Sequence, residues 1–154
     1  MPKPSLGLTV VSTLALAFGV HAETPKPQGV WIWDDGSVGV EFHSCGPSEC
    51  ARIVWLKRED AIGSAPVLDG KNPNPSLRAR RVCGIDYITG VNRSSDGNWR
   101  GGKVYDFNSG ATYDLDIDSF SGNEVKMRGF KGVRMLGANL KLVRPSSPLS
   151  RCGT

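Results

Sequence analysis

The strongest constraint on the fold of this 154-residue chain is a two-residue alternation near its middle. Within residues 113–118, three apolar residues alternate with three acidic ones: Tyr113, Leu115 and Ile117 with Asp114, Asp116 and Asp118. This period is typical of a half-buried β-strand that has one apolar and one acidic face. Residues 98–107 precede it as a second strand-like stretch, and Asn108-Ser109-Gly110 supplies a turn between them. Residues 98–117 therefore predict a β-hairpin.

The turn sets an expected register for this hairpin. Gly110 suits the positive φ of a three-residue loop with a bulge. In that register three pairs face each other, namely Phe107 with Ala111, Tyr105 with Tyr113, and Lys103 with Leu115. Trp99, Lys103 and Tyr105 would then share one face of the hairpin with Tyr113 and Leu115.

Further short strands separated by turn residues flank the hairpin. Gly is abundant at 19 residues and Pro at 10, whereas aromatic residues make up only 8%, which favours strands and turns over a helical bundle. The other expected strands span residues 29–33, 37–43, 51–57, 82–91, 124–130 and 137–144. With the hairpin they predict a single all-β domain over residues 29–144, an antiparallel eight-stranded up-and-down barrel. Such a barrel is wide enough for side chains or one small ligand.

One long polar segment, residues 58–81, interrupts the succession of short strands and turns. It predicts either a functional loop or a lid over one end of the barrel. Asn74 is a suitable cap and Pro75 a suitable first residue for a short helix over residues 76–80. The arginines Arg78, Arg80 and Arg81 favour a solvated loop face over an anion site. The candidate loop site comprises Asp69, Lys71, Asn72, Arg78 and Arg80.

The N-terminus predicts a signal peptide over residues 1–22. Lys3 gives a positive start, residues 6–20 form an apolar run, and Val20-His21-Ala22 offers a cleavage site before Glu23. A retained membrane anchor is the alternative, but the run is short for a membrane span. We therefore expect a periplasmic or secreted bacterial protein, with residues 23–28 as an extended leader and no membrane-spanning segment.

The net charge of the chain says little about its function. The formal net charge is +4, and removal of Lys3 with the signal peptide lowers it by one. No basic stripe is interleaved with aromatic residues, so nucleic acid is not an expected partner.

Four cysteines remain in the mature chain, and an even count in an exported protein indicates disulfides. Of the three possible pairings we favour Cys45–Cys50, which flank a Gly-Pro turn, with Cys83–Cys152. The second bridge would tether the tail, residues 145–154, to the barrel. Zinc is the weaker alternative because the chain has no CxxC motif and only His43 survives maturation. No metal or other cofactor is expected.

The acidic row of the hairpin has a structural explanation. If the next strand is regular, Lys126 and Arg128 fall opposite Asp116 and Asp114, which predicts ion pairs. A calcium site is disfavoured because alternating strand carboxylates lack the looping carbonyl ligands that calcium needs. Catalysis is not expected either, since a nucleophilic triad needs a histidine and His43 falls on an apparently solvent-facing strand position.

The chain resembles the bacterial family called domain of unknown function 2147. The resemblance rests on Gly29 and Trp31, Cys50 with residues 53–56, residues 69–80, Gly84, residues 99–106, Gly110, Tyr113, residues 128–132, Leu136, Gly137 and Arg144. It implies a small exported protein with a lipocalin-like barrel and no established reaction. By comparison with lipocalins, Arg144 is expected to lie across the indole of Trp31 and close the barrel.

These considerations favour a non-catalytic monomer that binds a small amphipathic or hydrophobic molecule. The candidate ligand residues are Trp55, Trp99, Lys103, Tyr105 and Tyr113. Lys103 would meet an acidic head group, because a buried unpaired ammonium is costly. The alternative is a structural or protein-interaction module of the cell envelope, with a barrel filled by its own side chains and Lys103 paired internally or reaching the rim.

Overall fold

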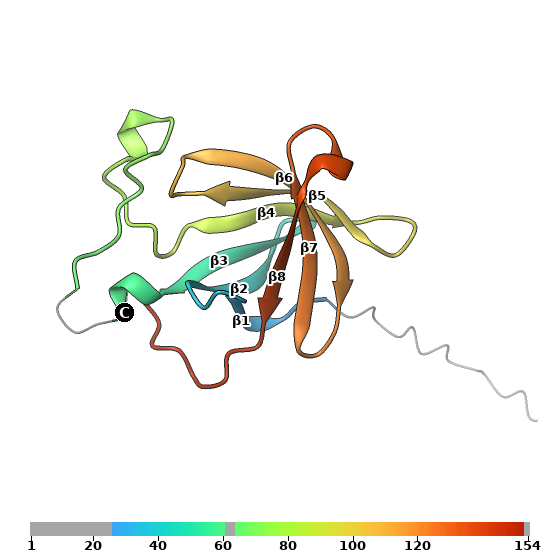
Figure 1. Ribbon diagram of the computed structural model, residues 1–154, viewed down its shortest axis with the longest axis horizontal. Helices are drawn as coiled ribbons and strands as arrows, with labels where there is room; N and C mark the ends of the chain where they lie inside the picture. Colours follow the sequence, from blue (N-terminus) through green and yellow to red (C-terminus); the bar gives the residue numbers. More distant parts are fainter. Residues whose placement is uncertain (1–25, 61–63, 153–154) are drawn as a thin grey trace, which may run out of the picture.

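The computed structural model describes residues 26–60 and 64–152, and these residues form an all-β fold (Figure 1). The strands are β1 (Gly29–Trp33), β2 (Val38–Cys45), β3 (Ser48–Leu56), β4 (Asp86–Arg93), β5 (Trp99–Asp106), β6 (Ala111–Phe120), β7 (Glu124–Phe130) and β8 (Ala138–Val143). They pair in sequence order, all antiparallel, into a closed barrel. The predicted eight-stranded up-and-down barrel is therefore confirmed.

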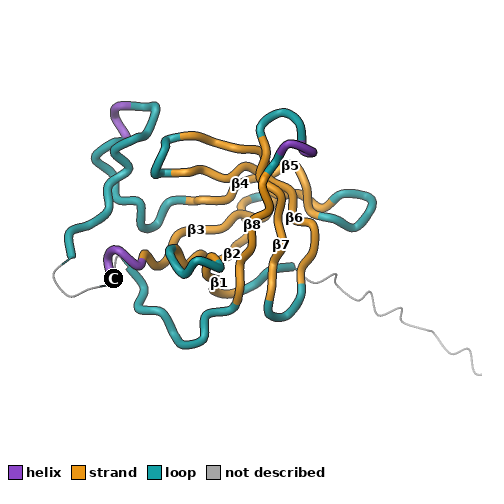
Figure 2. Tube along the Cα trace, viewed as in Figure 1, coloured by secondary structure: helices purple, strands orange, loops and turns teal. Residues whose placement is uncertain are grey.

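Three short 3₁₀ turns interrupt the connections: η1 (Lys57–Glu59), η2 (Pro75–Leu77) and η3 (Arg134–Leu136). Figure 2 shows these turns and the loops at the ends of the strands. At η2 the Asn74 side chain accepts a hydrogen bond from the Ser76 backbone, as a cap should, but the helix is shorter than expected. The fourth strand begins at Asp86 and not at Val82, because the backbone at Val82 and Gly84 bonds Val67 and Ile53 instead.

The antiparallel meander gives the barrel two different ends. The β2–β3, β4–β5 and β6–β7 turns lie at one end, which we call the base. The β1–β2 turn, the long β3–β4 loop, the β5–β6 turn and the β7–β8 loop lie at the other end, which we call the mouth. In Figure 1 the β3–β4 loop (green) extends beyond the barrel on the mouth side.

The base is closed by Trp31 and Arg144. The Trp31 side chain is fully buried, and the guanidinium carbon of Arg144 lies 3.6 Å from the centroid of its ring. Arg144 Nη1 donates to the carbonyls of Gln28 and Val30, at 2.8 and 3.0 Å. Its Nε donates to the carbonyl of Gly122 in the β6–β7 turn. The expected contact between Trp31 and Arg144 is thus confirmed, and it joins the first and last strands.

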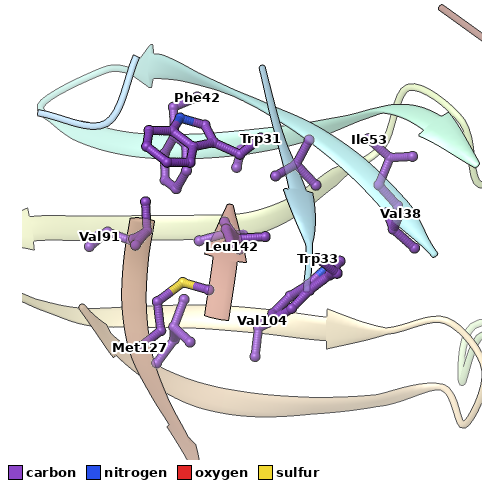
Figure 3. Close-up of a cluster of buried hydrophobic side chains, with 14 of the residues drawn as sticks. Trp31, Trp33, Val38, Phe42, Ile53, Val91, Val104, Met127 and Leu142 are labelled. Atoms are coloured by element: carbon purple, nitrogen blue, oxygen red, sulfur yellow. The ribbon is translucent and has the colours of Figure 1, made fainter. Parts of the chain in front are cut away.

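Much of the lumen is filled by apolar side chains, nine of which are labelled in Figure 3. The fully buried members include Trp31, Val40, Ile53, Ile88, Leu115, Val125, Met127 and Leu142. Burial of each such side chain contributes about 1.5–3 kcal/mol before conformational entropy is subtracted. The seam that closes the barrel is short, because β1 and β8 pair only at Ile32–Val143 and Trp33–Leu142.

The register predicted for the central hairpin is wrong by one residue. The loop spans residues 107–110, so Asp106 and not Phe107 pairs with Ala111. Phe107 leaves the strand to pack beside Tyr87, at 6.1 Å between ring centroids, and is buried. A slip of one residue moves every side chain to the other face of a strand. Lys103 is therefore opposite Asp114 on the outer surface, and its ammonium pairs with that carboxylate.

A bulge near the start of β5 shifts the register by a second residue, which returns the side chains before it to the expected face. Gly101 has a φ of +72°, and the register of the pair β5–β6 shifts between Trp99 and Gly102. Trp99 consequently faces the same side as Ile117, as expected, although the residues between them do not follow the predicted pairing.

The acidic row of β6 is held in ion pairs, but its partners differ from those expected. Asp116 pairs with Arg100 and Arg134, and Asp118 with Arg134. Arg128 lies opposite Asp116 in the ladder, and not opposite Asp114 as expected. Its guanidinium bonds the carbonyls of Arg134 and Met135 and the side chain of Asn139. Lys126 pairs with Glu124. The β7–β8 loop folds back over β6, so its arginine replaces the cross-strand partners.

Both favoured disulfides, Cys45–Cys50 and Cys83–Cys152, are present. The second bridge holds the tail against β3, where the Cys152 backbone N–H donates to the carbonyl of Val54 at 2.8 Å. Arg151 pairs with Glu41 on β2 beside it. The predicted signal peptide lies outside the described residues.

Candidate functional site

The mouth contains two adjoining hollows that share Val104, Tyr113 and Leu140 in their walls. The first, the aromatic hollow, has a volume of about 320 Å³ and is further lined by Trp33, Asp35, Ser37, Val38, Tyr87, Asp106, Phe107 and Asn108. The second, the loop hollow, has a volume of about 350 Å³ and is further lined by Gly129, Phe130, Lys131, Leu136, Gly137 and Ala138. Each is at the lower end of the size range of small-molecule pockets.

The aromatic hollow is built from strand ends that converge on the mouth. Trp33 ends β1, Val38 begins β2, and Val104 and Tyr113 are paired neighbours on β5 and β6. Trp33 meets Tyr87 edge-on, at 5.9 Å and 78° between the rings, and Tyr87 in turn meets Phe107. In Figure 3 Trp33 lies well apart from Trp31, so the two tryptophans of β1 serve different ends of the barrel.

Trp33 carries an unsatisfied hydrogen-bond donor. Its side chain is only 8% exposed, and Nε1 has no partner, alone among the buried side-chain nitrogens and oxygens of the described residues. A buried donor without an acceptor costs about 1–3 kcal/mol. Nε1 is itself shielded from solvent, so Trp33 contributes apolar surface to the wall of the hollow.

The electrostatic character of the aromatic hollow is negative. Burial raises the pKa of the Tyr87 hydroxyl, and the nearby carboxylates of Asp106 and Asp35 raise it further. Tyr87 therefore stays neutral at physiological pH and presents a polar, uncharged group beside two anionic ones.

Of the five predicted ligand residues, only Tyr113 lines these hollows. Lys103 lies outside, with Asp114. Tyr105 faces outward beneath the β3–β4 loop, and Trp99 lies at the base, where Arg93 stacks on it. Trp55 lies beside the C-terminal tail, on a separate surface, and its Nε1 donates to Asp60. The predicted face was wrong mainly because the hairpin register was.

The predicted loop site is a compact polar cluster centred on Asp69, whose side chain is fully buried. One carboxylate oxygen accepts from the Tyr105 hydroxyl at 2.5 Å, and the other accepts from Asn72 at 2.7 Å and Arg80 at 2.9 Å. Burial alone would raise the pKa of Asp69, but the hydrogen bonds and the charge of Arg80 outweigh it, so this pKa is lowered. Because both oxygens are hydrogen-bonded, the charge is paired with Arg80 and the side chain is fully buried, the cluster is suited to fix the loop on β5 and not to bind a ligand.

The other two candidate residues of the loop, Arg78 and Lys71, also help to hold the β3–β4 loop in place. Arg78 Nε donates to the carbonyl of Asn72 at 2.8 Å, within the loop itself. The backbone carbonyl of Lys71 packs so closely on the β5–β6 turn that a Cβ at Gly110 would lie 2.0 Å from it. Glycine at position 110 is thus required twice, by this contact and by a φ of +77°.

Replacing Asp69 with asparagine is expected to lower the free energy of unfolding by about 2 kcal/mol at pH 7, because it removes a buried charge from its partners. A group with a lowered pKa stabilises the fold above its unfolded pKa and loses that contribution as pH falls through the folded value. The difference between wild type and Asp69→Asn should therefore shrink below about pH 4. Urea unfolding at pH 7 and pH 3 measures it. An equal difference at both pH values would contradict the ion-pair explanation.

The residues that sequence reasoning missed are Trp33, Tyr87, Val104, Leu140, Asp35 and Asp106. Trp33 shares one strand face with Trp31 by alternation, but nothing in the alternation separates a residue that fills the base from one that lines the mouth. His43, considered for catalysis, bonds Asp86 at 2.8 Å on the outer surface. In the described part of the chain, no helix is long and apolar enough to span a bilayer.

Comparison with known protein families assigns this chain to a family. The profile described as "Uncharacterized protein conserved in bacteria (DUF2147)" matches residues 29–144. The chain belongs to DUF2147. The matched range starts with β1 and ends at Arg144, so the DUF2147 match covers the whole barrel and both residues that close its base.

A solved structure has the same fold as this DUF2147 chain. It is protein HP1028 from the human pathogen Helicobacter pylori, described as belonging to the lipocalin family. The TM-score is 0.65 at 22% sequence identity, over 78% of this chain and 83% of that chain. At this identity the likeness establishes a lipocalin-like fold. No curated protein sequence matches the chain.

Proposed function

We propose that this protein is a non-catalytic, exported, monomeric binding protein that takes a small amphipathic or hydrophobic molecule into the mouth of its barrel. The observation that carries the proposal is the pair of adjoining hollows, walled by aromatic and aliphatic side chains, in a barrel that is otherwise packed. Two disulfides and the bacterial family support an oxidising, exported location.

The ligand's expected position differs from that suggested by the sequence. Lys103 is removed as the head-group partner, since it lies on the outer surface in an ion pair with Asp114. Tyr113 remains, and Trp33, Tyr87, Val104 and Leu140 join it.

Leu140→Trp tests the proposal because Leu140 stands in the wall shared by both hollows. The larger side chain should fill that space and weaken binding of the neutral dye N-phenyl-1-naphthylamine by at least about tenfold. A tenfold loss of affinity corresponds to about two methylene groups of the dye that are no longer buried. Dye fluorescence on titration measures the affinity. Leu68→Trp, the same substitution at an exposed position of the β3–β4 loop, should bind as wild type does. If neither wild type nor Leu68→Trp binds any neutral or charged amphiphile, the proposal is wrong.

A second function, a protein-interaction module of the envelope, is favoured by one observation. The β7–β8 loop exposes Val133, Met135 and Leu136, the last two at 82% and 83%. Such adjacent exposed apolar side chains are typical of contact surfaces. Native mass spectrometry of protein purified from its own compartment separates the two functions. A bound small molecule supports the first, and a stoichiometric protein partner supports the second.

A further inference from the structure

In the part of the chain that the structure describes, nearly all carboxylates pair with a cation, as expected for a sequence with 19 Lys and Arg residues and 15 Asp and Glu residues. Within the described residues, only Asp35, Asp60 and Asp106 form no ion pair. Asp60 accepts instead from the indole of Trp55. The other two, Asp35 and Asp106, line the aromatic hollow together.

Both carboxylates are held in place by their own turns. Asp35 accepts from the Ser37 backbone at 2.8 Å, and Asp106 accepts from the Asn108 backbone at 3.0 Å and the Ser109 hydroxyl at 2.6 Å. A carboxylate has about four acceptor positions, so each retains free capacity. These contacts come from neutral donors and leave both negative charges uncompensated.

The walls between these carboxylates are aromatic. Trp33, Tyr87, Phe107 and Tyr113 all line the same hollow. Ring faces attract cations, and a desolvated ammonium over a tryptophan or tyrosine gains considerably from them. Aromatic side chains alone would suit any apolar group, but together with two unpaired carboxylates they select a positive one.

The neighbouring cations do not occupy this place. Arg58 lies 5.8 Å from the centroid of Phe107 and donates to Asn108, but it lines a different hollow together with Lys71. Lys141 pairs with Asp34, next to Asp35. Lys131 lines the loop hollow, where it would repel a second cation.

We infer that the aromatic hollow receives the ammonium end of a cationic amphiphile, while its apolar tail lies in the loop hollow against Phe130, Leu136 and Leu140. This assignment rests on the proposed function and specifies its ligand class. The charges orient the ligand, since Asp35 and Asp106 attract the ammonium at one end and Lys131 repels it at the other.

Calorimetric titration with three probes of one chain length tests this assignment. The probes are octyltrimethylammonium, 1-octanol and octyl sulfate, each below its micellar concentration. Wild type should bind the ammonium probe at least about tenfold more tightly than the alcohol, and the sulfate most weakly. The double variant Asp35→Asn with Asp106→Asn keeps one acceptor oxygen at each position for the backbone N–H groups of Ser37 and Asn108. The amide nitrogen that replaces the second oxygen of Asp106 can donate to the Ser109 hydroxyl, so that contact is kept with its direction reversed. The double variant should lose about tenfold in affinity for the ammonium probe and keep its affinity for octanol.

Asp34→Asn is the control. It also removes a negative charge, but Asp34 is the residue next to Asp35 and its carboxylate is already paired with Lys141. It should leave all three affinities unchanged. If all three probes bind equally, or the double variant binds the ammonium probe as wild type does, the proposed function stands and the ligand class is wrong. If wild type prefers octyl sulfate and the Arg58→Gln variant loses that preference, the cationic ligand class is likewise wrong. If no probe binds, both the ligand class and the proposed function fail.

Discussion

Trp31→Ala is expected to lower the free energy of unfolding by about 3–5 kcal/mol, the range for truncating a large buried aromatic side chain. Three separate contacts disappear with the indole. These are the stacked guanidinium of Arg144, the edge contact with Phe120 at 5.6 Å, and the hydrogen bond from Nε1 to the Gln28 carbonyl at 3.0 Å. Urea unfolding followed by circular dichroism measures the loss.

Two further substitutions locate the source of that loss. Trp31→Phe keeps an aromatic ring for Arg144 but loses the hydrogen bond, and should cost about half as much. Met135→Ala removes a side chain that is 82% exposed and should change the stability by less than about 0.5 kcal/mol. A Trp31→Ala protein as stable as Met135→Ala would show that the base is not where the barrel is held closed.

Removing the Cys83–Cys152 disulfide by a double serine substitution is expected to lower the free energy of unfolding by about 4 kcal/mol. The bridge joins residues 69 apart, and a longer closed loop restricts the unfolded chain more. The tail also packs on the barrel, since a Cβ at Gly39 would lie 2.9 Å from the Leu149 side chain. Its release would expose that contact and the face of Trp55.

The Cys45–Cys50 bridge gives the internal comparison, because its residues are only 5 apart. In the chain-entropy model its removal should cost about 2 kcal/mol, roughly half as much. Guanidinium unfolding of both double serine variants, with the wild type under oxidising conditions, measures the difference. Equal losses would mean that native contacts of the tail, and not loop closure, determine the stabilisation.

The sequence predicted the barrel because period-two alternation and turn residues recur along most of the chain. The strands, the two disulfides and the Trp31–Arg144 contact all follow from short-range patterns or from the family resemblance. The hairpin shows where such reasoning ends. Whether Phe107 belongs to the strand or to the turn depends on its packing beside Tyr87, a residue 20 positions earlier that no local pattern connects to it.

The site was harder to predict for the same reason. Lys103 was assigned to the lumen by counting residues back from the turn, so a single residue of error moved it to the outer surface. The hollows themselves depend on the depth to which each inward side chain fills the barrel. Trp31 and Trp33 are both tryptophans on the inner face of β1, yet one closes the base and the other walls the mouth.

The hydrogen bonds of Arg144 to Gln28 and Val30 also fix the direction in which the chain enters the barrel. Gln28 precedes β1 at the base, at the opposite end from both hollows. A fluorophore, surface or affinity matrix attached ahead of Lys26 would therefore hold the molecule by its closed end. The mouth would point away from the attachment, so ligand titrations on immobilised protein should agree with those in free solution.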